Sequence, residues 1–182
     1  MTTKQFFQSK AFRCIAVLLC IALISGGLLA ILNDVWEVSD EEIINRAIKE
    51  LCGDEVKLSE TIKIDESYTA PSGSIDAVYK LSNNSYLIQS TGNDGFHSGT
   101  VSVYVLANSE GVVQKVSIAD YASSQTLMSK FTDAVLAKFE GLSSKYTGGT
   151  IASGATYSSK AVQNGVNNAI DYLNKVLLKE VA

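Results

Sequence analysis

The sequence predicts an α+β protein, in which an N-terminal single transmembrane helix is followed by a domain with an antiparallel sheet and flanking helices. Three observations support this class. Residues 14–32 carry no charge, several short β-rich segments follow them, and two segments with helical apolar spacing come last. Strands that precede helices, instead of alternating with them, are typical of α+β domains.

Length and composition limit the possible classes. A chain of 182 residues has room for one domain plus a membrane segment. Its 46% hydrophobic content and single proline indicate a folded protein rather than a disordered one. The net charge of −4, without any basic stripe, argues against nucleic-acid binding. With His97 as the one histidine and Cys52 as an incidental thiol outside the apolar run, we expect no metal site, disulfide framework or catalytic site.

The N-terminal part is expected to anchor the protein. Residues 1–13 are polar and basic, and the run at 14–32 is about 28 Å long at about 1.5 Å per residue, close to the hydrocarbon thickness of a bilayer. A cleaved signal peptide is the competing interpretation, but its apolar core is normally only roughly 7–15 residues long. Basic residues before the run and acidic residues after it place residues 1–13 in the cytoplasm. The sequence therefore predicts a single-pass protein of the cell (inner) membrane.

Residues 33–54 are expected to form a juxtamembrane helix. Residues 39–42 have the form of a capping box, apolar residues follow at helical spacing, and Gly53 is a helix stop signal. This helix would lead from the membrane to the globular part of the chain.

Residues 55–182 are expected to form one extracytoplasmic domain. Alternating apolar residues and turn signals predict strands at 56–64, 75–81, 86–89, 100–106 and 112–118, and the last two form a hairpin. Apolar residues at helical spacing predict helices at about 124–139 and at 160–178. The second helix carries one apolar stripe of Ala161, Val162, Gly165, Val166, Ala169, Ile170, Leu173 and Leu177.

The small residues at 150–159, between these two helices, contain the candidate site. Thr156 is expected in a turn that opens the last helix, where free N–H groups and the positive end of the helix dipole suit a phosphate. A hydroxyl at this point can carry a phosphoester. The alternative is that Thr156 or Ser158 only caps the helix, and physical chemistry alone favours this alternative because capping Ser and Thr are common.

Residues 153–156, Ser-Gly-Ala-Thr, resemble the flavinylation motif of the FMN-binding domain family. That domain is found in a flavin-carrying subunit of Rnf-type ion-translocating electron transport complexes and in a related subunit of sodium-translocating NADH:quinone reductases. There the last threonine of the motif carries FMN through a phosphoester that a flavin transferase installs, so the resemblance implies covalent FMN on Thr156. The implied binding residues of this segment are Ser153, Gly154, Ala155, Thr156, Ser158 and Ser159.

Two further segments belong to the resemblance. Residues 95–99 look like the family's Gly-aromatic-x-x-Gly turn, which implies that Gly95, Phe96 and Gly99 contact the flavin. Residues 123–128 stand where the family has Glu-Thr-Pro-Gly-Leu-Gly, and only Leu127 matches. The family also usually has an acidic residue six positions before the modified threonine, where this chain has Thr150. Both departures bear on the flavin pocket and on the efficiency of the transferase.

The resemblance covers most of the chain and implies an electron-transfer subunit of a ferredoxin:NAD translocase, which works with other integral-membrane subunits and is no enzyme on its own. Two alternatives stay open: a stand-alone, membrane-anchored extracellular flavoprotein, and a cofactor-free anchored binding domain. The intact mass separates the binding domain from both flavoproteins, and co-purification with other subunits separates the two flavoproteins from each other.

The first testable prediction concerns the anchor. Because residues 14–32 are uncharged and follow a basic segment, the mature protein is expected to keep residues 1–32 and to resist carbonate extraction from membranes. N-terminal sequencing and extraction measure this directly. A mature chain that begins after Gly27 would contradict the prediction.

Overall fold

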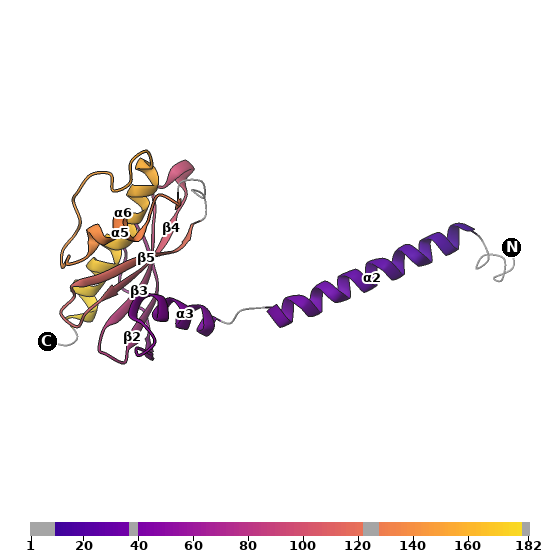
Figure 1. Ribbon diagram of the computed structural model, residues 1–182, viewed down its shortest axis with the longest axis horizontal. Coiled ribbons are helices and arrows are strands. Elements are labelled where there is room, and N and C mark those ends of the chain that lie inside the picture. Colours follow the sequence, from indigo (N-terminus) through magenta and orange to yellow (C-terminus); the bar gives the residue numbers. More distant parts are fainter. Residues whose placement is uncertain (1–9, 37–39, 122–127, 180–182) are drawn as a thin grey trace. The chain divides into compact units, whose positions relative to one another are not determined.

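The computed structural model describes residues 10–36, 40–121 and 128–179. The chain divides into two compact units, Met1–Ile43 and Ile44–Ala182 (Figure 1). The first unit contains helix α2 (Lys10–Trp36), and the second contains the sheet and the helical residues from Ile44 onwards.

Helix α2 confirms the helix expected at residues 14–32 and extends beyond it at both ends. Its large apolar side chains are exposed all along the described stretch, with exposed fractions from 56% at Leu28 to 70% at Ile24. The one polar side chain inside the apolar run, Ser25, donates its hydroxyl proton back to the helix, to the carbonyl of Ile21 at 2.8 Å. A membrane span is not found: among the described residues, no helix is both long and apolar enough to cross a bilayer.

The second unit is built on a five-stranded antiparallel sheet in which neighbours along the chain are neighbours in space, in the order β1-β2-β3-β4-β5. The strands confirm the five expected ones and are β1 (Leu58–Ile62), β2 (Gly73–Leu81), β3 (Tyr86–Gly92), β4 (Val101–Ala107) and β5 (Val113–Tyr121). The antiparallel register places Ser90 opposite Val103 in the β3–β4 pair and Val105 opposite Val116 in the β4–β5 pair.

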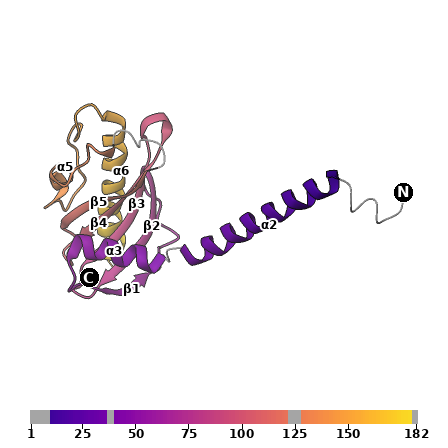
Figure 2. The ribbon, with the colours of Figure 1, turned by 45° about the vertical axis from the view of Figure 1, so that its right-hand side comes forward.

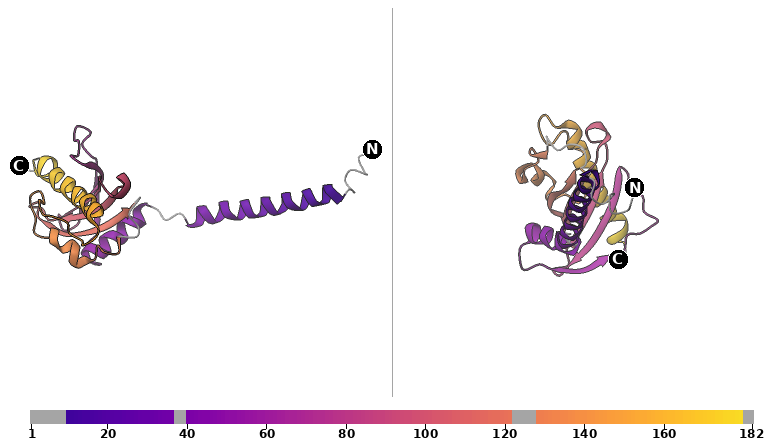
Figure 3. Two further views of the ribbon diagram at one scale, coloured as in Figure 1. Left: turned by 90° about the horizontal axis from the view of Figure 1, so that it is seen from above. Right: turned by 90° about the vertical axis from the view of Figure 1, so that its right-hand side faces the viewer.

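The alternation in β4 explains why both faces of the sheet are covered. Val101, Val103 and Val105 point to one face and lie in the core beneath helix α6 (Thr156–Tyr172). Tyr104 and Leu106 point to the other face, where they belong to a second core with the apolar residues of helix α3 (Asp40–Cys52) from Ile44 onwards. The two helices therefore pack on opposite faces of the sheet, as two views show (Figures 2 and 3).

The last helix is longer than its sequence pattern. The apolar stripe expected at 160–178 is confirmed as buried, but α6 begins at Thr156 and widens after Tyr172 into a π-helical turn, η3 (Leu173–Leu177). Of the helix expected at residues 33–54, the part after the capping box is confirmed as α3, which ends before Gly53, where φ is +86°, whereas residues 33–36 belong to α2.

The single continuous helix expected at about 124–139 is interrupted in the range that the structure describes. Residues 124–127 lie outside the described residues, Met128 is helical, residues 129–132 are not, and helical structure resumes in α5 (Asp133–Leu136) and the 3₁₀ turn η2 (Ala137–Phe139). Thr132 has extended backbone, with ψ at 163°, and so interrupts any helix between Met128 and Asp133. The apolar residues Met128, Phe131, Leu136 and Phe139 are buried all the same. A turn followed by a short helix thus produces the same apolar spacing as one continuous helix.

Helix α6 lies against β3 at a point where neither element has a side chain. A Cβ added to Gly92 would collide with backbone atoms of Ala161 and Gly165, and a Cβ added to Gly165 would lie 2.9 Å from Cγ2 of Val103. Beside this contact, the buried hydroxyl of Ser90 donates to the carbonyl of Gly165 at 2.7 Å. The two glycines and the serine therefore fix how closely, and in which register, α6 packs on the sheet.

The second prediction tests this contact. Gly92→Ala is expected to lower the free energy of unfolding by about 1–3 kcal/mol, because rigid backbone atoms face the new methyl group and the whole helix must shift. Gly149→Ala is the matched control, since a Cβ there meets no atom within 4 Å, and it is expected to change stability by less than about 0.5 kcal/mol. Urea denaturation followed by circular dichroism measures both. Equal stability of the two variants would show that the close contact is not required.

Candidate functional site

Thr156 is the first residue of α6, and its side chain is exposed. Gly154 precedes it with φ at +72°, a left-handed conformation that favours glycine, and Ala155 occupies the cap position. Ala155 makes no side-chain cap hydrogen bond, so the interpretation of Thr156 or Ser158 as the residue in the cap position is wrong. With alanine in that position, the first N–H groups of α6 have no side-chain cap among the described residues.

The motif serines have different roles in holding this turn. The hydroxyl of Ser159 accepts a hydrogen bond from the backbone N–H of Ala152 at 3.2 Å, and the N–H of Ala155 donates to the carbonyl of Ala152 at 3.2 Å. The turn is thereby folded back onto the first turn of α6. Ser158 is fully buried, and its hydroxyl has no hydrogen-bond partner in the described part of the chain. Ser153 is exposed.

Two lysines that the sequence analysis did not single out approach the same loop. The ammonium group of Lys130 donates to the carbonyl of Ser153 at 2.9 Å, and that of Lys138 donates to the carbonyl of Ile151 at 2.8 Å. Residues 141–170 contain no aspartate or glutamate. The position of Thr150, where the resembled family has an acid, thus belongs to a loop whose nearest charged contacts are positive.

The Gly95–Gly99 turn lies beside the start of α6. Its backbone is closed by a hydrogen bond from the N–H of Gly95 to the carbonyl of Gly99 at 2.8 Å, and it contains the 3₁₀ turn η1 (Phe96–Ser98). His97 and Ser98 both have positive φ, at 51° and 60°, which is uncommon for residues with a side chain. Strained backbone of this kind is often found at functional sites.

Side chains from this turn and from α6 form an open pocket. It has a volume of about 610 Å³ and is lined by Asn93, Asp94, Gly95, Phe96, His97, Ser98, Tyr157 and Lys160. The rings of Phe96 and Tyr157 are tilted toward each other with centroids 6.3 Å apart, and they are exposed by 44% and 62%. Exposed aromatic faces next to one another suit a flat ring as ligand.

The charged groups at the rim of this pocket also tie its two sides together. Lys160 pairs with the carboxylate of Asp94 at 2.9 Å, and the amide of Asn164 donates to the carbonyl of Asn93 at 2.9 Å. The hydrogen bond and the charge of Lys160 lower the pKa of the Asp94 carboxyl. The predicted residues Gly95, Phe96 and Gly99 are therefore brought to the start of α6, whereas Leu127 lies outside the described residues.

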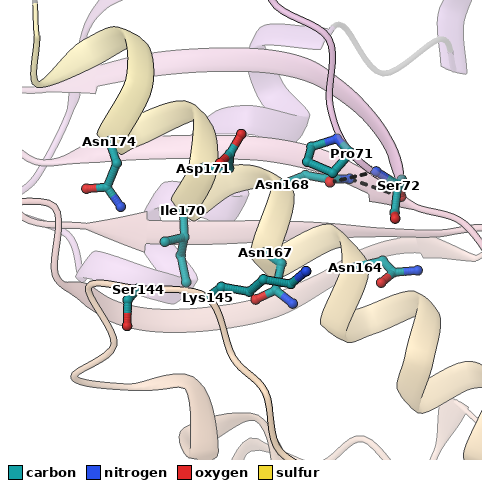
Figure 4. Close-up of a pocket in the computed structure, with 10 residues that line it drawn as sticks. All are labelled: Pro71, Ser72, Ser144, Lys145, Asn164, Asn167, Asn168, Ile170, Asp171 and Asn174. Carbon is teal, nitrogen blue, oxygen red and sulfur yellow. Dashed lines mark hydrogen bonds between the residues drawn. The ribbon is translucent and has the colours of Figure 1, made fainter.

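A second pocket, of about 250 Å³, runs along α6 and is rich in asparagine (Figure 4). Two of its asparagine amides are already hydrogen-bonded to backbone groups of neighbouring segments. Asn168 is 1% exposed and binds the N–H and carbonyl of Ser72 and the carbonyl of Thr91, at 3.1–3.2 Å. Asn167 binds both backbone groups of Tyr146 in the same way. Because these amides already bind backbone groups, they are not free to bind a ligand. The pocket lined by Phe96 and Tyr157 is therefore the better candidate site.

The comparisons with known proteins agree with this choice. No curated protein matches the chain. Residues 96–171 match the model of the FMN-binding domain family, a segment that begins in the Gly95–Gly99 turn, includes Thr156 and ends in α6. This match supports an FMN-binding domain in the chain, with FMN as its cofactor and electron transfer as the role that such a domain suggests.

Proposed function

We propose that this protein is the electron-transfer subunit of a membrane-bound, ion-translocating oxidoreductase complex of the Rnf type, with FMN attached to the Thr156 hydroxyl by a phosphoester. One observation carries the proposal. Thr156 is exposed at the first position of α6, next to the aromatic pocket, inside the segment that matches the FMN-binding domain model.

The residues around Thr156 fit a flavin phosphate. The first N–H groups of α6 lack a side-chain cap and suit an anion. The buried Ser158 hydroxyl has no partner within the described residues, and Gly154 keeps a Cβ away from the Lys130 ammonium group. The rings of Phe96 and of Tyr157, the residue after Thr156, suit a flat aromatic group.

Each group has a definable task in this function. FMN, when bound, supplies the electron-transfer chemistry of its ring. Thr156 would hold the phosphate through its ester, the start of α6 and Lys130 would solvate the remaining negative charge, and Phe96 with Tyr157 would orient the ring. The protein thus supplies placement and electrostatics, and the covalent bond keeps a cofactor from diffusing away outside the cytoplasm.

The proposal includes residues 14–32 as a single membrane anchor with the N-terminus in the cytoplasm and the domain outside it. The uncharged run and the exposed apolar side chains along α2 motivate this, because exposed apolar surface of that kind marks a membrane or protein interaction site. The other subunits of the complex would be integral-membrane proteins, and a flavin transferase would complete the site. Co-purification of such subunits distinguishes this protein from a stand-alone flavoprotein.

The third prediction tests the attachment residue. Protein from a host with an active flavin transferase should show flavin fluorescence after denaturing electrophoresis, and its mass should exceed the sequence mass by one FMN less one water. Thr156→Ala removes the hydroxyl that forms the ester, so fluorescence and added mass should disappear together. Since Ala155, not Thr156, is in the cap position, the free energy of unfolding of the variant should differ from that of the native protein by less than about 0.5 kcal/mol.

Thr147→Ala is the matched control, because Thr147 is an exposed threonine of the preceding loop that lies outside the implied binding residues. This variant should keep the flavin, and Thr156→Ser should keep part of it. Native protein without any covalent flavin would contradict the proposed function and favour a cofactor-free binding domain. If Thr156→Ala retained covalent flavin, the attachment residue would have to be a different one.

A further inference from the structure

Lys130 is held against the candidate attachment turn although it lies far from it in sequence. Its neighbours Met128 and Phe131 are both buried at 7% exposure and are joined by a hydrogen bond from the Phe131 N–H to the Met128 carbonyl at 3.0 Å. The backbone beneath Lys130 is therefore fixed. From this base the ammonium group reaches the Ser153 carbonyl at 2.9 Å.

The ammonium group of Lys130 has unused binding capacity. It carries three N–H donors, and one of them is used by Ser153. In the parts of the chain that the structure describes, no carboxylate pairs with Lys130, in contrast to Lys160, which pairs with Asp94. The charge of Lys130 therefore lacks an anionic partner within the described protein.

The ammonium group of Lys130 also lies beside Gly154. A Cβ at Gly154 would lie 2.8 Å from Nζ of Lys130, so a side chain there would displace the ammonium group, which can move because it is the end of a flexible side chain. The φ of +72° is the stronger reason for glycine at this position. Thr156 follows two residues later.

We propose that Lys130 is the phosphate-positioning residue of this site, a role that rests on the proposed function. In the attachment step, the Thr156 oxygen would form a bond to the flavin-side phosphorus of a flavin dinucleotide. The pyrophosphate bond breaks, a nucleoside monophosphate leaves, and the hydroxyl proton passes to solvent. Lys130 would bind an oxygen of the transferred phosphate during this step and remain paired with the phosphoester afterwards.

The test compares Lys130 with Lys138, a second lysine whose ammonium group donates to a carbonyl of the same loop. Lys138 donates to the Ile151 carbonyl at 2.8 Å, so it holds the loop in the same manner two residues further from the turn. The full chain and its Lys130→Met, Lys130→Arg and Lys138→Met variants are incubated with a flavin transferase and flavin adenine dinucleotide. Intact mass gives the rate of FMN attachment.

We expect Lys130→Met to slow attachment about tenfold, Lys130→Arg to restore most of the rate because it keeps the charge and the donors, and Lys138→Met to stay within about twofold of the native rate. A second measurement is independent of rate. The phosphorus-31 resonance of the attached phosphate should shift in Lys130→Met and stay in place in Lys138→Met, while both variants keep the far-UV circular dichroism of the native protein.

The outcomes separate this inference from the proposed function. If native protein is modified and Lys130→Met is modified at the same rate with an unchanged resonance, Lys130 has no role at the phosphate although the function stands. Equal losses in the two methionine variants would show that the lysines only hold the loop, and would also overturn the inference. If native protein is never modified, the proposed function itself fails.

Discussion

The contact between α6 and β3 is the constraint on which the rest of the domain depends. Gly92 and Gly165 let the two backbones meet, and the Ser90 hydroxyl binds the helix there. Because Gly92 is also the last residue of β3, this contact brings the following Gly95–Gly99 turn to the N-terminal part of α6. Both sides of the candidate pocket are therefore positioned by one packing contact in the interior.

Polar side chains of α6 complete the arrangement by binding the backbone of loops that cross the helix. Asn164 holds the Asn93 carbonyl, Asn167 holds Tyr146, and Asn168 holds Ser72 and Thr91. The amides of Asn167 and Asn168 each bind an N–H and a carbonyl together, so each can replace the pairing that a crossing segment lacks, whereas the amide of Asn164 only donates. Helix α6 thus binds segments that are far apart in sequence, and the candidate site lies at the start of the same helix.

The sequence predicted most of the fold because its periodicity is clear there. The alternation of valines in β4 and the apolar stripe of α6 both correspond to buried faces. The prediction of one continuous helix at 124–139 was wrong only in its continuity, since residues 129–132 interrupt it while Met128, Phe131 and Phe139 are all buried. The periodicity of apolar residues indicates which side chains are buried. It is less informative about whether the backbone is one continuous helix or is interrupted.

The site was predicted less completely. Thr156 was singled out as a candidate through a resemblance, whereas the physical argument alone favoured Thr156 or Ser158 as the helix cap, a position that Ala155 occupies. Ala155 in the cap position was the available signal, because alanine cannot accept a hydrogen bond there. Lys130 could not be found by spacing, since its approach to Ser153 depends on the packing of Met128 and Phe131. Long-range contacts of this kind arise from tertiary structure and leave no local pattern.

If FMN is attached at Thr156 as proposed, the left-handed turn before this residue bears on when the attachment takes place. The turn is held by Ser159, Lys130 and Lys138, and the two lysines lie 23 and 13 residues away from the carbonyls that they bind, so these contacts belong to the folded domain. In an unfolded chain, residues 153–156 are four small residues without any distinguishing surface. An enzyme that recognises the turn would thus require the folded domain as its substrate. Attachment of the cofactor would then follow folding and would not assist it.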